Sequence, residues 1–204
     1  NPQKKLKCIS IVGTNGKYST IQAIRAILKE ANINLNIYTS PHIQKINERF
    51  VFNNQQLKDD DLASLFEEVE KINDNKPITF FEILTACFFY KAAQYPNNVN
   101  LIESGLFHRF DATNILKNNI ASVITSISKD HLDWLPENER TIDKIIYEKT
   151  SKLLNSKIIV AKQNTISTME KIKKTISENQ SDKYYFNEDF SYSFVENDFF
   201  YYED

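Results

Sequence analysis

One short segment could bind a chain of phosphate groups: Gly13, Thr14, Asn15, Gly16, Lys17, Tyr18 and Ser19. Such a ligand needs backbone N–H groups that converge on it, the N-terminus of a helix and a nearby cation. The two glycines permit the turn, and Lys17 supplies the positive charge. The segment has two residues fewer between its glycines than the Walker consensus, and Tyr18 stands where a small residue is usual. We interpret it as a phosphate-binding loop, with an ordinary strand-to-helix turn as the alternative.

A second group of polar side chains follows strand-like apolar runs further along the sequence. Glu103 ends the run 99–103, and Asp130 with His131 follows the run 121–127. Ligands gather at the carboxyl edge of a parallel sheet, so these residues are candidates for a metal site. Carboxylate oxygens suit Mg²⁺, whereas histidine is a less usual ligand for it. The structural alternatives are a paired carboxylate for Glu103 and a helix cap or core hydrogen-bonding residue for His131.

Lys149 is predicted to face the protein interior. It lies three or four residues from Ile145, Ile146 and Leu153, which belong to the apolar stripe of a predicted helix. A lysine on such a stripe must extend its ammonium group to water, pair with an acid or lose its charge. The sequence leaves these alternatives open.

The segments between these residues have the apolar periodicity of strands and helices. Nearly continuous apolar runs, typical of buried strands, occur at 6–12, 36–39, 99–103, 121–127 and 157–161. Apolar residues at helical spacing occur at 19–31, 59–72, 80–94, 141–154 and 165–178. The alternation predicts an α/β fold like that of P-loop NTPases, in which helices flank a mostly parallel sheet. We assign residues 1–180 to this domain.

The C-terminal segment 181–204 has a different composition. It is rich in tyrosine and phenylalanine, with polar turn residues between the aromatic ones. Such a pattern favours short antiparallel strands, so we expect the start of a small β subdomain.

The composition excludes several classes of protein. The 204 residues include 41% hydrophobic and 25% charged residues, as expected for a globular protein. Lys and Arg total 25 against 27 for Asp and Glu, and this balance does not favour a nucleic-acid or membrane-surface partner. No apolar run is long enough to span a membrane, and no signal peptide is recognisable. The cysteines, Cys8 and Cys87, lie in apolar runs and indicate reduced core residues of a cytoplasmic protein.

The loop and seven further motifs, which occur in order along the chain, give the sequence a specific resemblance. The loop Gly13–Lys17 is similar to the nucleotide loop of the Mur ligase superfamily. The other motifs resemble the folylpolyglutamate synthase/dihydrofolate synthase family, and the similarity extends over roughly residues 6–165. These motifs are Tyr38-Thr39-Ser40-Pro41-His42, Asn47-Glu48-Arg49, Thr79-Phe80-Phe81-Glu82, Glu103-Ser104-Gly105-Leu106, Arg109-Phe110-Asp111-Ala112-Thr113-Asn114, Thr125-Ser126-Ile127-Ser128-Lys129-Asp130-His131 and Tyr147-Glu148-Lys149.

The resemblance implies a Mur-ligase-type ATP-binding domain with a defined set of site residues. ATP would bind at Gly13 to Ser19, with Lys17 on the phosphates. Magnesium would be held by Ser40, Glu103 and His131, and Lys149 would be carbamylated near a second metal position. The implied reaction is ATP-dependent amide formation, in which a dihydropteroate or folate carboxylate becomes an acyl phosphate and the amine of glutamate then displaces phosphate. Lys17, Lys149 and His131 are the expected catalytic residues.

The sequence departs from the family pattern in two respects. Tyr18, Phe107 and His108 stand where the family carries glycine, and we expect Tyr18 to obstruct the phosphate turn rather than to stack on the base. The family also has a pterin-binding segment before the loop and a C-terminal domain that 204 residues do not accommodate. The alternative function is therefore a truncated, non-catalytic module with impaired ATP binding, or one that needs the missing domain or a separate chain.

Overall fold

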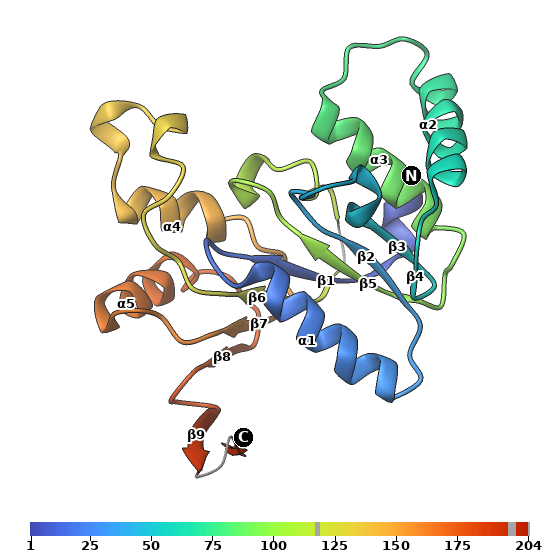
Figure 1. Ribbon diagram of the computed structural model, residues 1–204. Coiled ribbons are helices and arrows are strands. Elements are labelled where there is room, and N and C mark those ends of the chain that lie inside the picture. Colours follow the sequence, from blue (N-terminus) through green and yellow to red (C-terminus); the bar gives the residue numbers. More distant parts are fainter. Residues whose placement is uncertain (117–118, 196–198, 204) are drawn as a thin grey trace.

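An eight-stranded sheet forms the centre of the molecule, with helices packed on both of its faces (Figure 1). The structure is a computed structural model, and it describes residues 1–116, 119–195 and 199–203. The strand order is β4–β3–β2–β5–β1–β6–β7–β8. The strands are β1 (Lys7–Val12), β2 (Leu35–Tyr38), β3 (Phe50–Phe52), β4 (Gln55–Gln56), β5 (Val99–Glu103), β6 (Asn119–Ile124), β7 (Lys157–Val160) and β8 (Lys183–Tyr185).

Six neighbouring strands of the sheet run parallel: β2, β5, β1, β6, β7 and β8. The carboxyl ends of these strands therefore lie at the same edge of the sheet. The helices that connect and cover them are α1 (Lys17–Glu30), α2 (Asp59–Asn73), α3 (Phe80–Ala92), α4 (Ile142–Thr150) and α5 (Ile166–Thr175). Single-turn 3₁₀ helices are η1 (Pro2–Lys5), η2 (Ile46–Arg49), η3 (His108–Phe110), η4 (Leu132–Trp134) and η5 (Glu137–Glu139). The predicted α/β fold is confirmed.

Alternating side chains along β1 divide the core between the two faces of the sheet. Ile11 packs in one cluster with Ile21 of α1, whereas Cys8 packs in another with residues of α2 and α3. A third cluster joins Val12 to the apolar faces of α4 and α5. Cys8 and Cys87 are buried free thiols, as predicted. None of the helices in the described ranges could cross a lipid bilayer.

An antiparallel hairpin extends the sheet beyond β2, which the apolar pattern did not predict. β3 pairs with β2 and with β4, and the loop between β3 and β4 is Asn53 and Asn54. Both asparagines have positive φ, 50° and 68°, as a two-residue type I′ turn requires. The strands are too short for a periodicity signal, but the Asn-Asn pair could have indicated the turn.

The C-terminal segment divides between two sheets. β8 pairs parallel with β7, so the expectation that the aromatic strands are antiparallel is wrong for β8. The β7–α5–β8 unit is a crossover connection, which returns the chain to the same sheet in the same direction. β9 (Ser191–Val195) and β10 (Phe199–Glu203) form the expected separate antiparallel pair. Residues 196–198 and 204 of the predicted subdomain, and the side chains of residues 194–201, lie outside the described set.

α4 ends earlier than the sequence predicted. It spans Ile142–Thr150 rather than 141–154, because the chain turns after Thr150, where the Leu153 N–H donates to the Thr150 carbonyl at 3.3 Å. Leu153 nevertheless remains in the core. Lys149 thus lies in the last turn of α4, near the carboxyl edge of the sheet.

Candidate functional site

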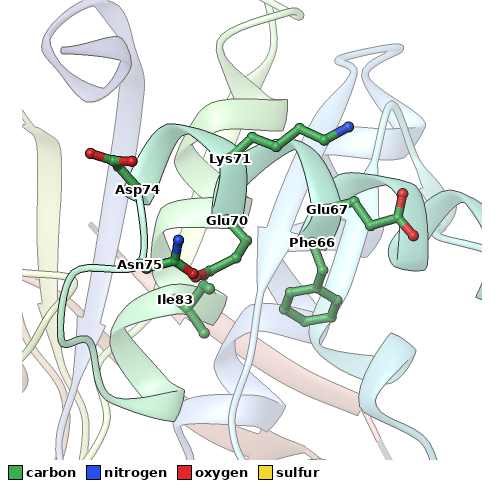
Figure 2. A pocket seen from close by; sticks show the side chains of 7 residues that line it. All are labelled: Phe66, Glu67, Glu70, Lys71, Asp74, Asn75 and Ile83. Atoms are coloured by element: carbon green, nitrogen blue, oxygen red, sulfur yellow. The ribbon is translucent and has the colours of Figure 1, made fainter.

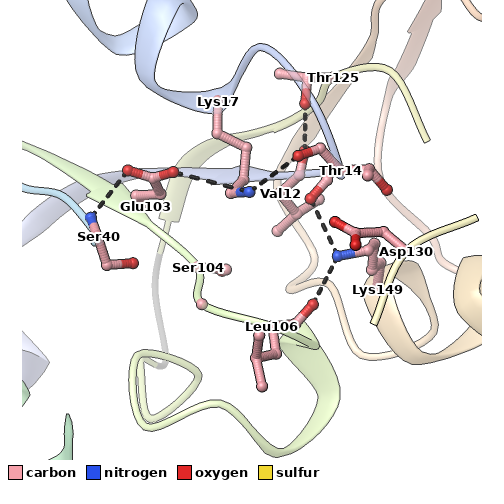
Figure 3. A network of polar contacts seen from close by, with 12 residues as sticks. Val12, Thr14, Lys17, Ser40, Glu103, Ser104, Leu106, Thr125, Asp130 and Lys149 are labelled. Carbon is pink, nitrogen blue, oxygen red and sulfur yellow. Dashed lines mark hydrogen bonds and ion pairs between the residues drawn. The ribbon is translucent and has the colours of Figure 1, made fainter. Parts of the chain in front are cut away.

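A hollow of about 560 Å³ lies on the α2–α3 side of the molecule (Figure 2). Its lining is Phe66, Glu67, Glu70, Lys71, Asp74, Asn75 and Ile83. None of the residues predicted to bind nucleotide or metal lines this hollow. The chemistry predicted from the sequence gathers instead at the loops that follow β1, β2, β5 and β6 (Figure 3).

The loop between β1 and α1 has the geometry of an anion site at the start of a helix. Gly13 has φ +146° and Gly16 has φ +83°. A Cβ atom on Gly13 would lie 2.0 Å from Thr125 Oγ1, so only glycine fits against the loop after β6. α1 begins at Lys17 without a side-chain cap, which leaves its first-turn amides available to an anion.

Two backbone amides of the predicted phosphate-binding loop already donate hydrogen bonds within the protein. The N–H groups of Thr14 and Asn15 donate to the Ser126 carbonyl at 2.9 and 3.1 Å. These bonds, together with the Thr14 Oγ1 contact to the Ser128 carbonyl, tie the loop to the segment after β6. The amides that can face a phosphate are therefore those from Gly16 to Ser19.

Lys17 connects the loop to Glu103. Its Nζ donates to the Thr14 carbonyl at 3.3 Å and lies 3.8 Å from Glu103 Oε1. Glu103 is 3% exposed, and its Oε2 accepts the Ser40 N–H at 3.0 Å. Burial raises the pKa of the Glu103 carboxyl, and the Ser40 amide and the Lys17 charge partly oppose that shift. Figure 3 shows the chain of contacts from Ser40 through Glu103 and Lys17 to Thr14.

Lys149 faces inward, as predicted, and its tip does not reach water. It is 2% exposed, and its Nζ donates to the carbonyls of Leu106 at 2.6 Å and Gly13 at 3.1 Å. Among the described residues it forms no ion pair with a carboxylate. Burial, with the charge of Lys17 as a smaller cause, lowers the pKa of Lys149 to about 8. The alternative of a lysine that extends its ammonium group to water is therefore wrong.

His131 lies on the β6 side of the site in a left-handed conformation, with φ 56°. Its N–H donates to Asp130 Oδ1 at 2.8 Å, and its Nε2 lies 3.2 Å from Asp130 Oδ2. The Phe107 ring meets the imidazole edge-on at 6.3 Å between centroids. Partial burial lowers the pKa of His131, with the charges of Lys149 and Lys17 as smaller causes, while Asp130 raises it.

The residues predicted to bind magnesium fit such an ion in part. The Glu103 carboxylate and Ser40 are in direct contact and offer the oxygen donors that Mg²⁺ prefers. His131 is instead engaged by Asp130. Within the described ranges no three His, Cys, Asp or Glu side chains gather as a ready-made metal cluster. Ser40 and Glu103 could thus hold an ion whose remaining positions are filled by phosphate and water.

The bulky replacements of the family glycines lie in different places. Tyr18 is 59% exposed, and its obstruction of the phosphate turn stays a prediction. His108 is buried, with its Nδ1 2.8 Å from Ser104 Oγ, and does not enter the site. Phe107 lies against the site, with its ring centroid 5.5 Å from Lys149 Nζ.

Asp111 shapes the site, although the sequence analysis assigned it no role of its own. Its partly buried carboxylate accepts the N–H groups of Gly105 at 2.8 Å and Thr113 at 2.9 Å. A Cβ on Gly105 would lie 2.6 Å from the same carboxylate. Asp111 therefore shapes the loop that presents the Leu106 carbonyl to Lys149. Its position inside a recognised motif was the available signal.

Comparison with known proteins identifies the family. No family model matches the chain. A dihydrofolate synthase/folylpolyglutamate synthase of Bacillus subtilis is 37% identical over 157 residues, which are 73% of this chain and 35% of that protein. The Escherichia coli protein of the same name is 36% identical over 137 residues, which are 66% of this chain and 32% of that protein. The chain belongs to the dihydrofolate synthase/folylpolyglutamate synthase family.

Solved structures of the family share the fold. E. coli FolC in complex with DHPP and ADP matches all of this chain and 48% of its own, with 29% identity and a TM-score of 0.87. The Yersinia pestis family member complexed with AMPPNP and Mn ion matches 99% of this chain and 48% of its own, with 26% identity and a TM-score of 0.86. The chain spans about a third of the length of the curated relatives that it matches.

The fit of Gly13 against Thr125 predicts unequal effects of alanine at the two loop glycines. We expect Gly13→Ala to lower the free energy of unfolding by roughly 1–3 kcal/mol more than Gly16→Ala. Both positions have positive φ, but a Cβ on Gly16 meets nothing closer than 4.0 Å. Urea unfolding of the two variants and the wild type measures the difference. Equal losses would contradict the close approach of Gly13 to Thr125.

The lowered pKa of Lys149 predicts a pH-dependent contribution to stability. Between about pH 8 and 10.5 the unfolded chain keeps the Lys149 proton while the folded chain loses it. The stability of the wild type relative to Lys149→Met should therefore rise with pH in this window, by at most about 1.4 kcal/mol per pH unit, and be constant below it. Urea unfolding in CO₂-free buffers measures both proteins, and other titrating groups cancel in the difference. Parallel pH profiles would show that Lys149 keeps an ordinary pKa.

Proposed function

We propose that this chain is the ATP-binding portion of a ligase that joins L-glutamate to dihydropteroate or a folate. The observation that carries the proposal is the convergence of Lys17, Glu103 and Lys149 on one loop at the carboxyl edge of the sheet. Relatives with ADP or an ATP analogue bound support the nucleotide, and the curated relatives support the reaction class.

The proposed reaction has two displacement steps. A carboxylate oxygen of the acid substrate attacks the γ-phosphorus of ATP, so that the bond to ADP breaks and an acyl phosphate forms. The amine of glutamate then attacks the acyl carbon, phosphate leaves, and the amine loses a proton. Both steps develop negative charge on phosphoryl oxygens, which a fixed cation in a partly buried site stabilises.

Lys17 supplies that cation in the proposed site. Its ammonium group has three donors and contacts the Thr14 carbonyl and Glu103, and it would exchange these contacts for phosphate oxygens when nucleotide binds. Glu103 and Ser40 are the proposed metal-binding residues, with His131 as the third. A magnesium ion bound there would offset phosphate charge and polarise the transferred phosphoryl group.

Carbamylation of Lys149 is the second part of the proposal. A neutral amine is the form that attacks CO₂, and a pKa of about 8 leaves a substantial neutral fraction near neutral pH. The N–C bond forms as the amine loses a proton, and the buried cation becomes a carboxylate-like anion. That anion could no longer donate to the Leu106 and Gly13 carbonyls as the ammonium does, and it would add an oxygen ligand beside the loop.

Removal of the Lys17 ammonium tests the nucleotide site. We expect Lys17→Ala to weaken magnesium-dependent ATP binding by about 100-fold or more, because a charge-assisted contact to phosphate is lost. Isothermal titration calorimetry measures the affinity, and Lys29→Ala, on the exposed end of the same helix, is the matched control. A wild type with no ATP affinity, restored by glycine at 18, 107 and 108 together, would instead favour the non-catalytic module.

The carbamate on Lys149 has a direct spectroscopic test. In ¹³C-bicarbonate we expect a protein carbamate resonance that is absent in Lys149→Met and present in Lys152→Met, whose lysine is an exposed neighbour. The signal should increase as the pH approaches the Lys149 pKa, because the neutral amine fraction increases. An identical signal in Lys149→Met would assign the carbamate to another amine.

A further inference from the structure

Arg49 is a buried arginine at the same edge of the sheet. It is 8% exposed, it ends η2, and its carbonyl accepts the Thr39 N–H at 3.1 Å, one residue before Ser40. Its Nε donates to His42 Nδ1 at 2.9 Å, which requires His42 to present a lone pair there. Arg49 forms no ion pair with a carboxylate anywhere in the ranges that the structure describes.

The acids nearest to Arg49 have other partners. The carboxylate of Glu48, the preceding residue, accepts the N–H groups of Ile43, Gln44 and Lys45 at 2.8–2.9 Å. The charge of Arg49 partly opposes the burial that raises the pKa of the Glu103 carboxyl, but the two oxygens of Glu103 contact Ser40 and Lys17. A buried guanidinium is costly without an anion, and its planar fork of donors matches a carboxylate. The arrangement is that of a site which an anionic ligand completes.

The strand order gives the position of that ligand. β3 is antiparallel to β2, so Arg49 at its start lies at the edge where β2, β5 and β1 end. The nucleotide loop follows β1, which is three strands away from β3, or about 14 Å at the usual strand spacing. Glu103 is the last residue of β5, and β5 lies between β3 and β1 in the sheet. An anion on Arg49 therefore lies across Glu103 from the phosphate loop, where a phosphoryl acceptor would approach.

We propose that Arg49 binds the carboxylate of the acid substrate and holds it on the Glu103 side of the nucleotide loop. His42 is a positioning residue, because its Nδ1 fixes Nε of Arg49. The guanidinium also hydrogen-bonds Tyr38, and its remaining N–H groups are left to the ligand. This inference rests on the proposed function, since it assigns one of the two substrates of that reaction to a named side chain.

The test removes the charge from each partner in turn. Calorimetry measures the binding of dihydropteroate, and of its carboxamide, to the full chain in the presence of magnesium and ATP. We expect the wild type to bind the acid about tenfold or more tightly than the carboxamide, and Arg49→Gln to bind both equally with unchanged ATP affinity. Arg25→Gln on α1 is the matched control and should keep the wild-type preference.

Several outcomes would overturn the assignment. An Arg49→Gln protein that keeps the preference for the acid, or that loses ATP affinity as well, would show that Arg49 does not hold the substrate carboxylate. If the glutamine variant does not fold, Arg49→Lys decides the question. Its preference for the acid over the carboxamide should fall several-fold, because an ammonium group lacks the planar fork of donors of a guanidinium. An unchanged preference would refute the proposal. A wild type that binds ATP but does not distinguish acid from carboxamide overturns this inference alone, whereas a wild type that binds no ATP overturns the proposed function.

Discussion

The buried ammonium group of Lys149 joins three segments that are far apart in the sequence. It extends from the last turn of α4 and donates to the carbonyl of Gly13, in the nucleotide loop, and to that of Leu106, in the loop after β5. Both acceptors are uncharged, so the hydrogen bonds only partly offset the loss of hydration, and the pKa falls to about 8. The site depends on this contact because it fixes the distance between the proposed phosphate loop and the loop that follows Glu103.

The charges at this edge of the sheet alternate in sign along the strand order. Arg49 lies at β3, Glu103 ends β5, Lys17 follows β1, and Asp130 lies in the segment after β6. The charges of Arg49 and Lys17 both act to lower the pKa of the Glu103 carboxyl and so oppose the effect of burial. The alternation separates the two proposed places for anions, the first turn of α1 for phosphates and the Arg49 guanidinium for a carboxylate. A transfer reaction between two anionic ligands needs such a division, since their mutual repulsion must be offset on both sides of the transferred group.

Most of the fold was predictable because its elements carry strong local signals. The buried strands are continuous apolar runs, and the inward direction of Lys149 follows from its spacing to Ile145 and Ile146. The errors arose where the local signal was weak or misleading. β3 and β4 are too short to show periodicity, and the aromatic residues of β8 resemble an antiparallel hairpin although a crossover helix makes that strand parallel.

The sequence by itself determined the family, the α/β architecture and the identity of the residues at the phosphate loop, since glycine, lysine and apolar runs act through local backbone and burial preferences. Only the tertiary structure decided which partners those residues have. Thr14 and Asn15 give their amides to Ser126 rather than to a ligand, and Glu103 pairs with Lys17 and the Ser40 amide. Arg49 is buried, and none of the carboxylates that the structure describes forms an ion pair with it. The reason is physical: hydrogen bonds and charge pairs reach only a few ångströms, so they depend on which strand ends the sheet order brings together.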